Sequence, residues 1–147
     1  MVAHQLFQGA DLSRARLAAR LHPDFAWGHV ALARLLIQKE NWERARETLE
    51  VAEELESDRW DIHFLHGIFA FHDGFPEEAV AQFRQALTIH PENGETHFRL
   101  ANVLEAVGEL RGAREHFRAC VRFGSSDASV DEARRRIARI NERIGTE

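Results

Sequence analysis

Residues 74–91 read GFPEEAVAQFRQALTIHP, and residues 108–125 read GELRGAREHFRACVRFGS. The second stretch begins 34 positions after the first. The two share few identities, but the shared residues are in register: each opens with glycine, then has an alanine five positions on and a phenylalanine nine positions on. Aligned small residues are also found one period earlier, at Ala45 and Ala52. A skeleton of small and aromatic residues at a fixed period indicates repeated structural units.

Each copy contains two helical patterns. In the third copy, His97, Leu100, Ala101 and Leu104 have the i, i+3, i+4, i+7 spacing of one helix face. Gly108 follows, and glycine is common just past a helix end. Small residues on the first helices would face small residues on the second helices, so that the axes approach closely. Glycine within a helix costs about 1 kcal/mol relative to alanine, so close packing is the expected reason for Gly67.

These patterns predict an all-α fold, a solenoid of helix–turn–helix repeats with a concave groove. A single helix pair cannot bury both of its faces, and each copy would cover its neighbour. We expect one domain over residues 1–147. Its expected parts are a partial leading repeat (1–25), three repeats (26–59, 60–93 and 94–126) and a polar capping helix (127–147). The capping helix would begin after Ser126 or Asp127 and bury a thin apolar stripe, at Val130, Ala133, Ile137, Ile140 and Ile144.

The pattern resembles the tetratricopeptide repeat, a family with 34 residues per helix–turn–helix. In this family the first helix has a large aromatic residue and then Leu-Gly or Leu-Ala, and the second helix has an alanine, an aromatic residue, an alanine and a proline. The segments HFLHGIFAFHDGFPEEAVAQFRQALTIHP and HFRLANVLEAVGELRGAREHFRAC match most of these positions. The resemblance covers residues 26–125. The departures are histidines in place of an aromatic residue or a leucine, and serines in place of proline, at His29, His63, His97, His66, Ser57 and Ser125.

Composition excludes several classes of protein. The net charge of −5 argues against nucleic acid as the main partner. Apolar runs are broken by arginine, so we expect no membrane insertion and no signal peptide. The single cysteine, Cys120, excludes an intrachain disulfide framework and fits a reducing compartment, so we expect a cytoplasmic protein.

No established catalytic or cofactor-binding motif is present in the sequence. We therefore expect a non-enzymatic protein without a cofactor or a metal. His29, His63 and His97 would form a ladder along the stack, and we interpret them as packing residues rather than metal ligands or a pH-sensitive seam. Cys120 occupies a small-residue position and is expected to be a buried, inert thiol.

The surface beside the core stripe of the first helices carries the candidate binding residues. In the family that the sequence resembles, this face lines the groove that holds a partner's peptide. Apolar anchoring would come from one set of side chains, at Phe64, Ile68, Phe71 and Phe98. Orientation through charge-assisted hydrogen bonds would come from a second set, at Arg34, Asn102, Arg136 and Arg139. An alternative is that Phe64 and Phe98 lie partly between adjacent first helices.

The predicted function is a protein–protein interaction module or scaffold that binds a partner segment on its concave face. One alternative is a homo-oligomeric scaffold, in which another copy covers the leading half-repeat near Leu6, Phe7 and Leu12. Another is an accessory domain of a larger enzyme or of a secretion or assembly machine. The sequence does not identify the partner.

Overall fold

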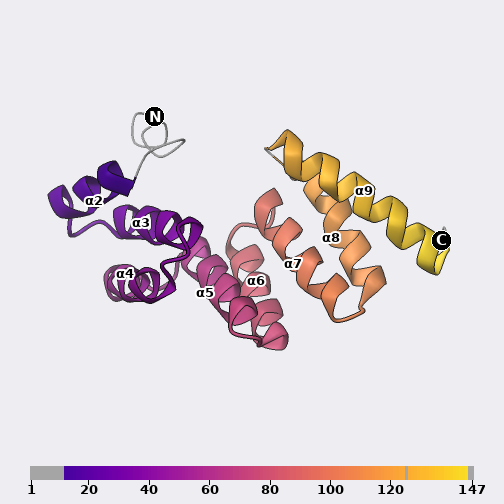
Figure 1. The fold of residues 1–147 in the computed structure, drawn as a ribbon, viewed down its shortest axis with the longest axis horizontal. Coiled ribbons are helices and arrows are strands. Elements are labelled where there is room, and N and C mark those ends of the chain that lie inside the picture. The colour runs from indigo at the N-terminus through magenta and orange to yellow at the C-terminus, as the bar shows by residue number, and fades with distance from the viewer. Residues whose placement is uncertain (1–11, 125, 146–147) are drawn as a thin grey trace. The chain divides into compact units, whose positions relative to one another are not determined.

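The computed structural model describes residues 12–124 and 126–145 (Figure 1). The predictions that involve Leu6, Phe7 and Ser125 lie outside these residues. The described part of the chain contains eight α-helices and no strand, so the predicted all-α class is confirmed. The helices are α2 (Leu12–Leu21), α3 (Ala26–Gln38), α4 (Trp42–Leu55), α5 (Trp60–His72), α6 (Pro76–Ile89), α7 (Gly94–Ala106), α8 (Leu110–Phe123) and α9 (Asp127–Ile144).

The helix boundaries repeat at the period of the sequence. The first helices α3, α5 and α7 begin at Ala26, Trp60 and Gly94, which are 34 residues apart. The second helices α4, α6 and α8 begin at Trp42, Pro76 and Leu110, at the same interval. Pro76 is the first residue of α6, where its missing N–H removes no helical hydrogen bond.

Each first helix ends in the same way. Gly74 and Gly108 follow α5 and α7 with φ angles of 88° and 86°, a left-handed conformation that glycine adopts without strain. The amide after each glycine bonds back to a carbonyl of the last helical turn, so that Phe75 N donates to Ala70 O and Glu109 N donates to Leu104 O, both at 2.8 Å. The predicted role of glycine as the stop signal is confirmed at both sites.

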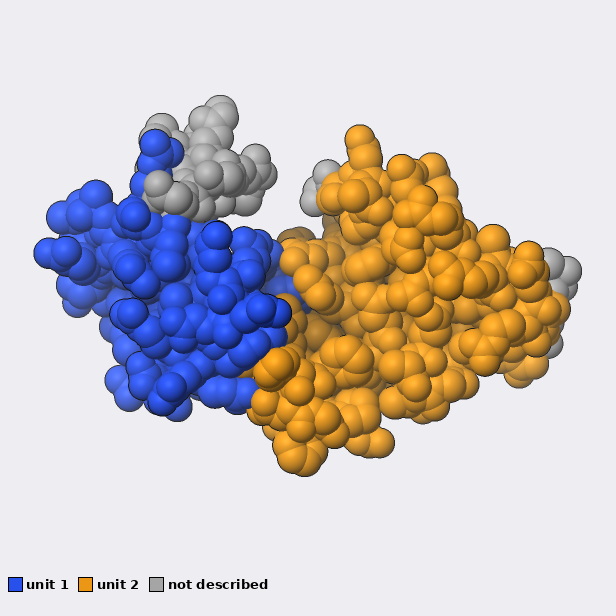
Figure 2. Space-filling view, in the orientation of Figure 1, with its two compact units in different colours: residues 1–65 blue, residues 66–147 orange. Residues whose placement is uncertain are grey.

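The chain divides into two compact units, residues 1–65 and residues 66–147, with the boundary inside α5 (Figure 2). In the first unit, α2 packs on α3 and α3 packs on α4. In the second unit, α6 packs on α7, α7 on α8 and α8 on α9. Each unit has its own buried apolar residues, with Ala33 and Leu49 in the first and Phe83 and Phe117 in the second. A single domain over the whole chain stays a prediction.

Close packing explains the glycine inside α5. A Cβ atom on Gly67 would lie 2.6 Å from Cε1 of Phe83, whose ring is fully buried in α6. The predicted reason for Gly67 is therefore confirmed. Gly94 shows a second close approach, because a Cβ atom there would lie 2.6 Å from the Cα atom of Gly124.

Helix α9 covers α8, and its apolar stripe is buried as the sequence predicts. Ser126 is the N-cap residue, Ala133 and Ile140 are almost fully buried, and the other members of the stripe are half-buried. Arg114 of α8 is buried without a signal in the sequence: it is 4% exposed and donates from Nη1 to Asn141 Oδ1 at 2.9 Å. No helix among the described residues is long and apolar enough to cross a membrane.

Candidate protein-interaction surface

Two of the eight candidate binding residues, Arg34 and Phe64, belong to the first unit. Phe64 is only 1% exposed, and its ring and that of Trp60 form a T-shaped pair with a centroid separation of 6.1 Å. The guanidinium carbon of Arg34 lies 5.3 Å from the centroid of the Phe64 ring. The structure therefore corrects the expectation of an exposed anchor at Phe64, because this ring is part of the core and supports Arg34 through a cation–π contact.

The other six candidates belong to the second unit. On α5, Phe71 is 45% exposed and Ile68, one turn earlier, is half-buried, so the two side chains lie on one face of the helix. On α7, Phe98 and Asn102 are half-buried and are also one turn apart. On α9, Arg136 is half-buried and Arg139 is exposed.

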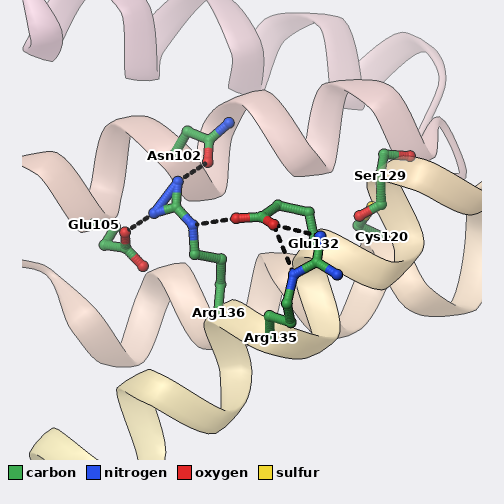
Figure 3. A network of polar contacts seen from close by, with 7 residues as sticks. All are labelled: Asn102, Glu105, Cys120, Ser129, Glu132, Arg135 and Arg136. Atoms are coloured by element: carbon green, nitrogen blue, oxygen red, sulfur yellow. Dashed lines mark hydrogen bonds and ion pairs between the residues drawn. The ribbon is translucent and has the colours of Figure 1, made fainter.

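Arg136 lies at the centre of a polar network that joins α9 to α7 (Figure 3). Its Nε donates to Glu132 Oε1 at 3.0 Å, its Nη1 donates to Glu105, and its Nη2 donates to Asn102 Oδ1 at 3.3 Å. Arg135 donates twice to the other carboxylate oxygen of Glu132, at 2.9 and 2.7 Å. The network contains two arginines and two glutamates, so its charges balance.

The pKa shifts follow from these contacts. Hydrogen bonds from Arg135 and then from Arg136 lower the pKa of Glu132, which stays ionised. Burial lowers the pKa of Arg136, but the hydrogen bonds to Glu132 and Glu105 outweigh burial and raise it overall. The guanidinium of Arg136 is thus already hydrogen-bonded to carboxylates of its own chain. It has fewer N–H groups left to donate to a carboxylate of a partner.

Two aromatic side chains pack beside this network. The Phe98 ring meets the Phe117 ring edge-on, with centroids 5.9 Å apart, and the guanidinium carbon of Arg136 lies 5.8 Å from the Phe117 centroid. Phe117 is fully buried, so both Phe98 and Arg136 pack against a residue of the core. Among the residues that the structure describes, the exposed Arg139 has no ion pair. Phe71 and Arg139 are therefore the candidates that are most available to a partner.

The predicted histidine ladder has a local structural role. His29 Nε2 lies 3.1 Å from Pro23 O, and His97 Nε2 lies 2.8 Å from Pro91 O, the equivalent contact two repeats later. In the middle repeat, His63 Nε2 lies 3.8 Å from the Asp58 carboxylate. Each histidine thus contacts the loop that precedes its own helix. No group of three histidine, cysteine or acidic residues in the described ranges could hold a metal ion.

A second histidine pair was not anticipated. His97 Nδ1 lies 3.0 Å from His116 Nδ1, and the two rings stack with centroids 5.3 Å apart, so that the pair joins α7 to α8. Because Pro91 O can only accept, His97 Nε2 carries a proton and His97 Nδ1 accepts from His116 in the neutral pair. Burial, followed by the nearby charges of His97 and Arg84, lowers the pKa of His116 to about 4.

Cys120 is fully buried, and its thiol contacts Ser129 O at 4.0 Å (Figure 3). Burial raises the pKa of this thiol, which disfavours the reactive thiolate. The predicted buried position is confirmed.

Sequence spacing could have identified part of the Arg136 network. Glu132 and Arg136 are four residues apart, the usual spacing of an ion pair along a helix. Glu105 and Arg136 are 31 residues apart, and only the packing of α9 against α7 brings them together. His97 and His116, 19 residues apart, likewise show no local signal.

Two family models, both of the tetratricopeptide repeat, match residues 30–94 and 70–137. Together they span most of the described helices. The chain belongs to the tetratricopeptide-repeat family. No curated protein matches the chain.

Solved structures of repeat proteins have the same fold at low sequence identity. TTC0263, a TPR protein of Thermus thermophilus, is 19% identical with a TM-score of 0.70, over 95% of this chain and 75% of its own. The type III secretion chaperone SycD of Yersinia enterocolitica, in complex with a peptide of the translocator YopD, is 17% identical with a TM-score of 0.62, over 79% and 88%. YrrB, described as a TPR protein with an unusual peptide-binding site, is 18% identical with a TM-score of 0.62, over 92% and 69%. These similarities establish a solenoid-class helical fold.

Proposed function

We propose that this chain is a non-enzymatic interaction module that binds a segment of another protein on the second unit. The proposed surface consists of Ile68 and Phe71 on α5, Phe98 and Asn102 on α7, and Arg139 on α9. Ile68, Asn102 and Arg136 lie 34 residues apart, on α5, α7 and α9. The tetratricopeptide-repeat fold is typical of protein-interaction modules, and two of the similar structures are described as peptide-bound or peptide-binding.

The exposure of Phe71 is the single observation that carries this proposal. A phenylalanine that is 45% exposed, one turn from a half-buried isoleucine, leaves apolar area in water that a partner can cover. Aromatic side chains in such positions contribute strongly to binding free energy. Arg139 adds a positive charge that has no ion pair within the described residues.

The partner chemistry follows from these groups. Apolar side chains at helical or extended spacing would cover Phe71 and Ile68, and a carboxylate would pair with Arg139. Arg136 is assigned a positioning role, because Glu105 and Glu132 already engage its guanidinium. Phe64 is excluded from direct contact because it is buried. Arg34 belongs to the first unit and is not part of this proposed surface, so its role in orienting a partner stays a prediction.

The test compares two double variants of matched chemistry. Phe71→Ala with Arg139→Ala removes the proposed contacts, whereas Phe75→Ala with Arg134→Ala removes an exposed phenylalanine and an exposed arginine that are not part of the proposed surface. Both proteins should keep the helical circular dichroism of the wild type. Each is used to capture proteins from a lysate of the source organism, and the captured proteins are identified by mass spectrometry and then titrated in purified form.

A partner that binds the wild type and the control, but is lost by the Phe71 and Arg139 variant, supports the proposal. A partner that all three retain places the interaction elsewhere. Capture of the chain alone favours the homo-oligomeric scaffold, and a partner that is itself an enzyme or part of a secretion machine favours the accessory-domain alternative.

A further inference from the structure

A groove on the first unit is lined by side chains of α2, α3 and α4, and its volume is about 380 Å³. Helix α3 packs on both α2 and α4, so the groove belongs to one compact unit. Its walls combine charged and apolar side chains, among them Arg16, Arg20, Leu32, Arg44, Glu47 and Val51. None of the residues proposed to bind a partner on the second unit lines this groove.

The groove carries a positive charge, because three arginines and only one glutamate line it. Arg16 and Arg20 are four residues apart and so lie on one side of α2, and both are exposed. Arg44 is exposed on α4. Among the described residues, none of the three guanidiniums has an ion pair or a hydrogen bond, and Glu47 pairs with none of them. The described part of the chain therefore leaves this positive charge without a counter-charge.

Helix α4 confines the positive charge to the groove. Arg44 and Val51 are seven residues apart, which places them on one side of the helix, and both line the groove. Four exposed glutamates follow the neighbouring stripe of α4, at Glu43, Glu47, Glu50 and Glu54. Only Glu47 of this stripe lines the groove. Acidic side chains thus border a basic groove.

Apolar side chains lie between the charges. Val51 is 41% exposed and Leu32 is half-buried, so both leave apolar area in water. A partner that supplied only carboxylates would not cover this area. An occupant with carboxylates and an apolar side chain would satisfy both kinds of group, as in the apolar core and polar rim of a protein interface.

We propose that this groove binds a short acidic segment of another protein, in which carboxylates flank an apolar side chain. Two carboxylates one helical turn apart match the spacing of Arg16 and Arg20, and a third pairs with Arg44. Each guanidinium can donate two parallel hydrogen bonds to a carboxylate. The apolar side chain covers Leu32 and Val51. This site is independent of the surface proposed on the second unit.

The distribution of charge favours this occupant over others. A nucleic acid is a long polyanion, and its phosphates beyond the groove would lie near the glutamates that border it on α4. The volume of the groove lies near the lower end of the range of about 300–1,000 Å³ for ligand sites, so it accommodates a few side chains. Residues 1–11 of the chain contain one acidic residue, Asp11, which cannot neutralise three arginines.

The first test selects binders from a display library of random peptides of about 12–15 residues, the length at which an isolated helix becomes marginally stable. The library is first depleted on a groove variant, Arg16→Gln with Arg20→Gln and Arg44→Gln, and is then selected on the wild type. Glutamine keeps the helix propensity of arginine but removes its charge. Depletion also removes peptides that bind the second unit, so this outcome is separate from that of the surface proposed there.

We expect the selected peptides to carry several aspartates or glutamates around an apolar residue. Enrichment of neutral or basic peptides would overturn the proposal, and so would a selection that enriches no peptide.

The second test measures the affinity of a selected peptide by fluorescence anisotropy. The groove variant should bind it more weakly by about 10-fold or more, because three charge-assisted contacts are lost. The matched control is Arg84→Gln with Arg99→Gln and Arg143→Gln, which removes three exposed arginines of the second unit that have no ion pair within the described residues. The control should bind like the wild type, and circular dichroism should show both variants to be folded. Equal binding by the groove variant and the control would overturn the proposal.

A third measurement tests the sign of the charge. Glu47→Gln removes the negative charge that lines the groove, so it should tighten binding by about 2–5-fold. Binding should weaken from about 0.1 M to about 1 M salt, because the screening length falls from about 10 Å to about 3 Å. Weaker binding by Glu47→Gln, or binding that salt does not change, would contradict an acidic occupant.

Two further measurements address the other occupants, and we expect a negative result from each. Mixed-sequence duplex DNA that binds the wild type and is lost by the groove variant would assign the arginines to phosphates and overturn the acidic segment. Analytical ultracentrifugation addresses a second copy of the chain. A mass that rises with concentration in the wild type, but not in the groove variant, would assign the groove to that copy and overturn binding of another protein.

Discussion

Glu40 occupies the position that glycine fills in the next two repeats. It follows α3, and its φ angle is 58°, close to the positive φ angles of Gly74 and Gly108. The surrounding hydrogen bonds are also repeated, since Asn41 N donates to Leu36 O at 2.8 Å. A residue with a Cβ atom in this conformation is destabilised by roughly 1–2 kcal/mol. The repeat geometry therefore imposes a strained backbone on Glu40.

Replacement of this glutamate by glycine tests the argument. Glu40→Gly should raise the free energy of unfolding by about 0.5–1 kcal/mol, because relief of the strain exceeds the added entropy of an unfolded glycine. Urea denaturation measures the change. The reverse substitution, Gly74→Ala, should lower stability by about 1 kcal/mol, since no atom lies within 4 Å to compensate the conformational cost. A loss of stability in Glu40→Gly would contradict this account.

Gly67 and Gly112 form a matched pair of glycines within helices. A Cβ atom on Gly67 would overlap the buried Phe83 ring, whereas one on Gly112 would meet only the end of the Leu104 side chain, at 3.4 Å. We expect Gly67→Ala to lower the free energy of unfolding by about 1–3 kcal/mol through overpacking. Gly112→Ala should raise it by about 0.5–1 kcal/mol through helix propensity. Equal effects in the two variants would exclude packing as the reason for Gly67.

At the scale of elements, the His97–His116 contact makes the α7–α8 pair sensitive to acid. The pKa of His116 falls from 6.5 to about 4 on folding, chiefly through burial. As the pH falls, His116 is therefore protonated in the unfolded chain before it is protonated in the folded chain. The stabilisation that is present above pH 6.5 is consequently lost as the pH falls to about 4. With allowance for solvent screening, the loss amounts to about 1–2 kcal/mol.

Urea denaturation at several pH values measures this dependence. His116→Asn keeps a donor near His97 but cannot titrate, so its stability should decline less between pH 6.5 and pH 4 than that of the wild type. His72→Asn, at an exposed position on α5, serves as the control. If the two variants follow the same pH profile, His116 is not the titrating group.

At the scale of the whole molecule, the repeat carries most of the information about the fold. The fixed offset of small residues and glycines predicts where helices begin and end, because these residues act through local backbone geometry and close helix contact. The same reasoning cannot predict Arg136 with Glu105, or His97 with His116, since these pairs depend on how one helix is rotated against another. The burial of Phe64 could not be predicted either. Its position in the repeat predicts an exposed side chain, but its large ring packs against Trp60 and Arg34 and is part of the core.

Helix α9 completes the second unit, because repeats of this kind bury their apolar faces only against a neighbour. Ile140 is 1% exposed and contributes to that cover, so Ile140→Ala should lower the free energy of unfolding by about 2–4 kcal/mol. Arg143→Ala, at an exposed position of the same helix, should change it by less than about 0.5 kcal/mol.

A chain that ends at residue 126 should melt at a lower temperature than either variant, because Phe117 and Cys120 lose their cover. An unchanged melting temperature in the shortened chain would show that α8 needs no cap, and thermal denaturation followed by circular dichroism decides between the two outcomes.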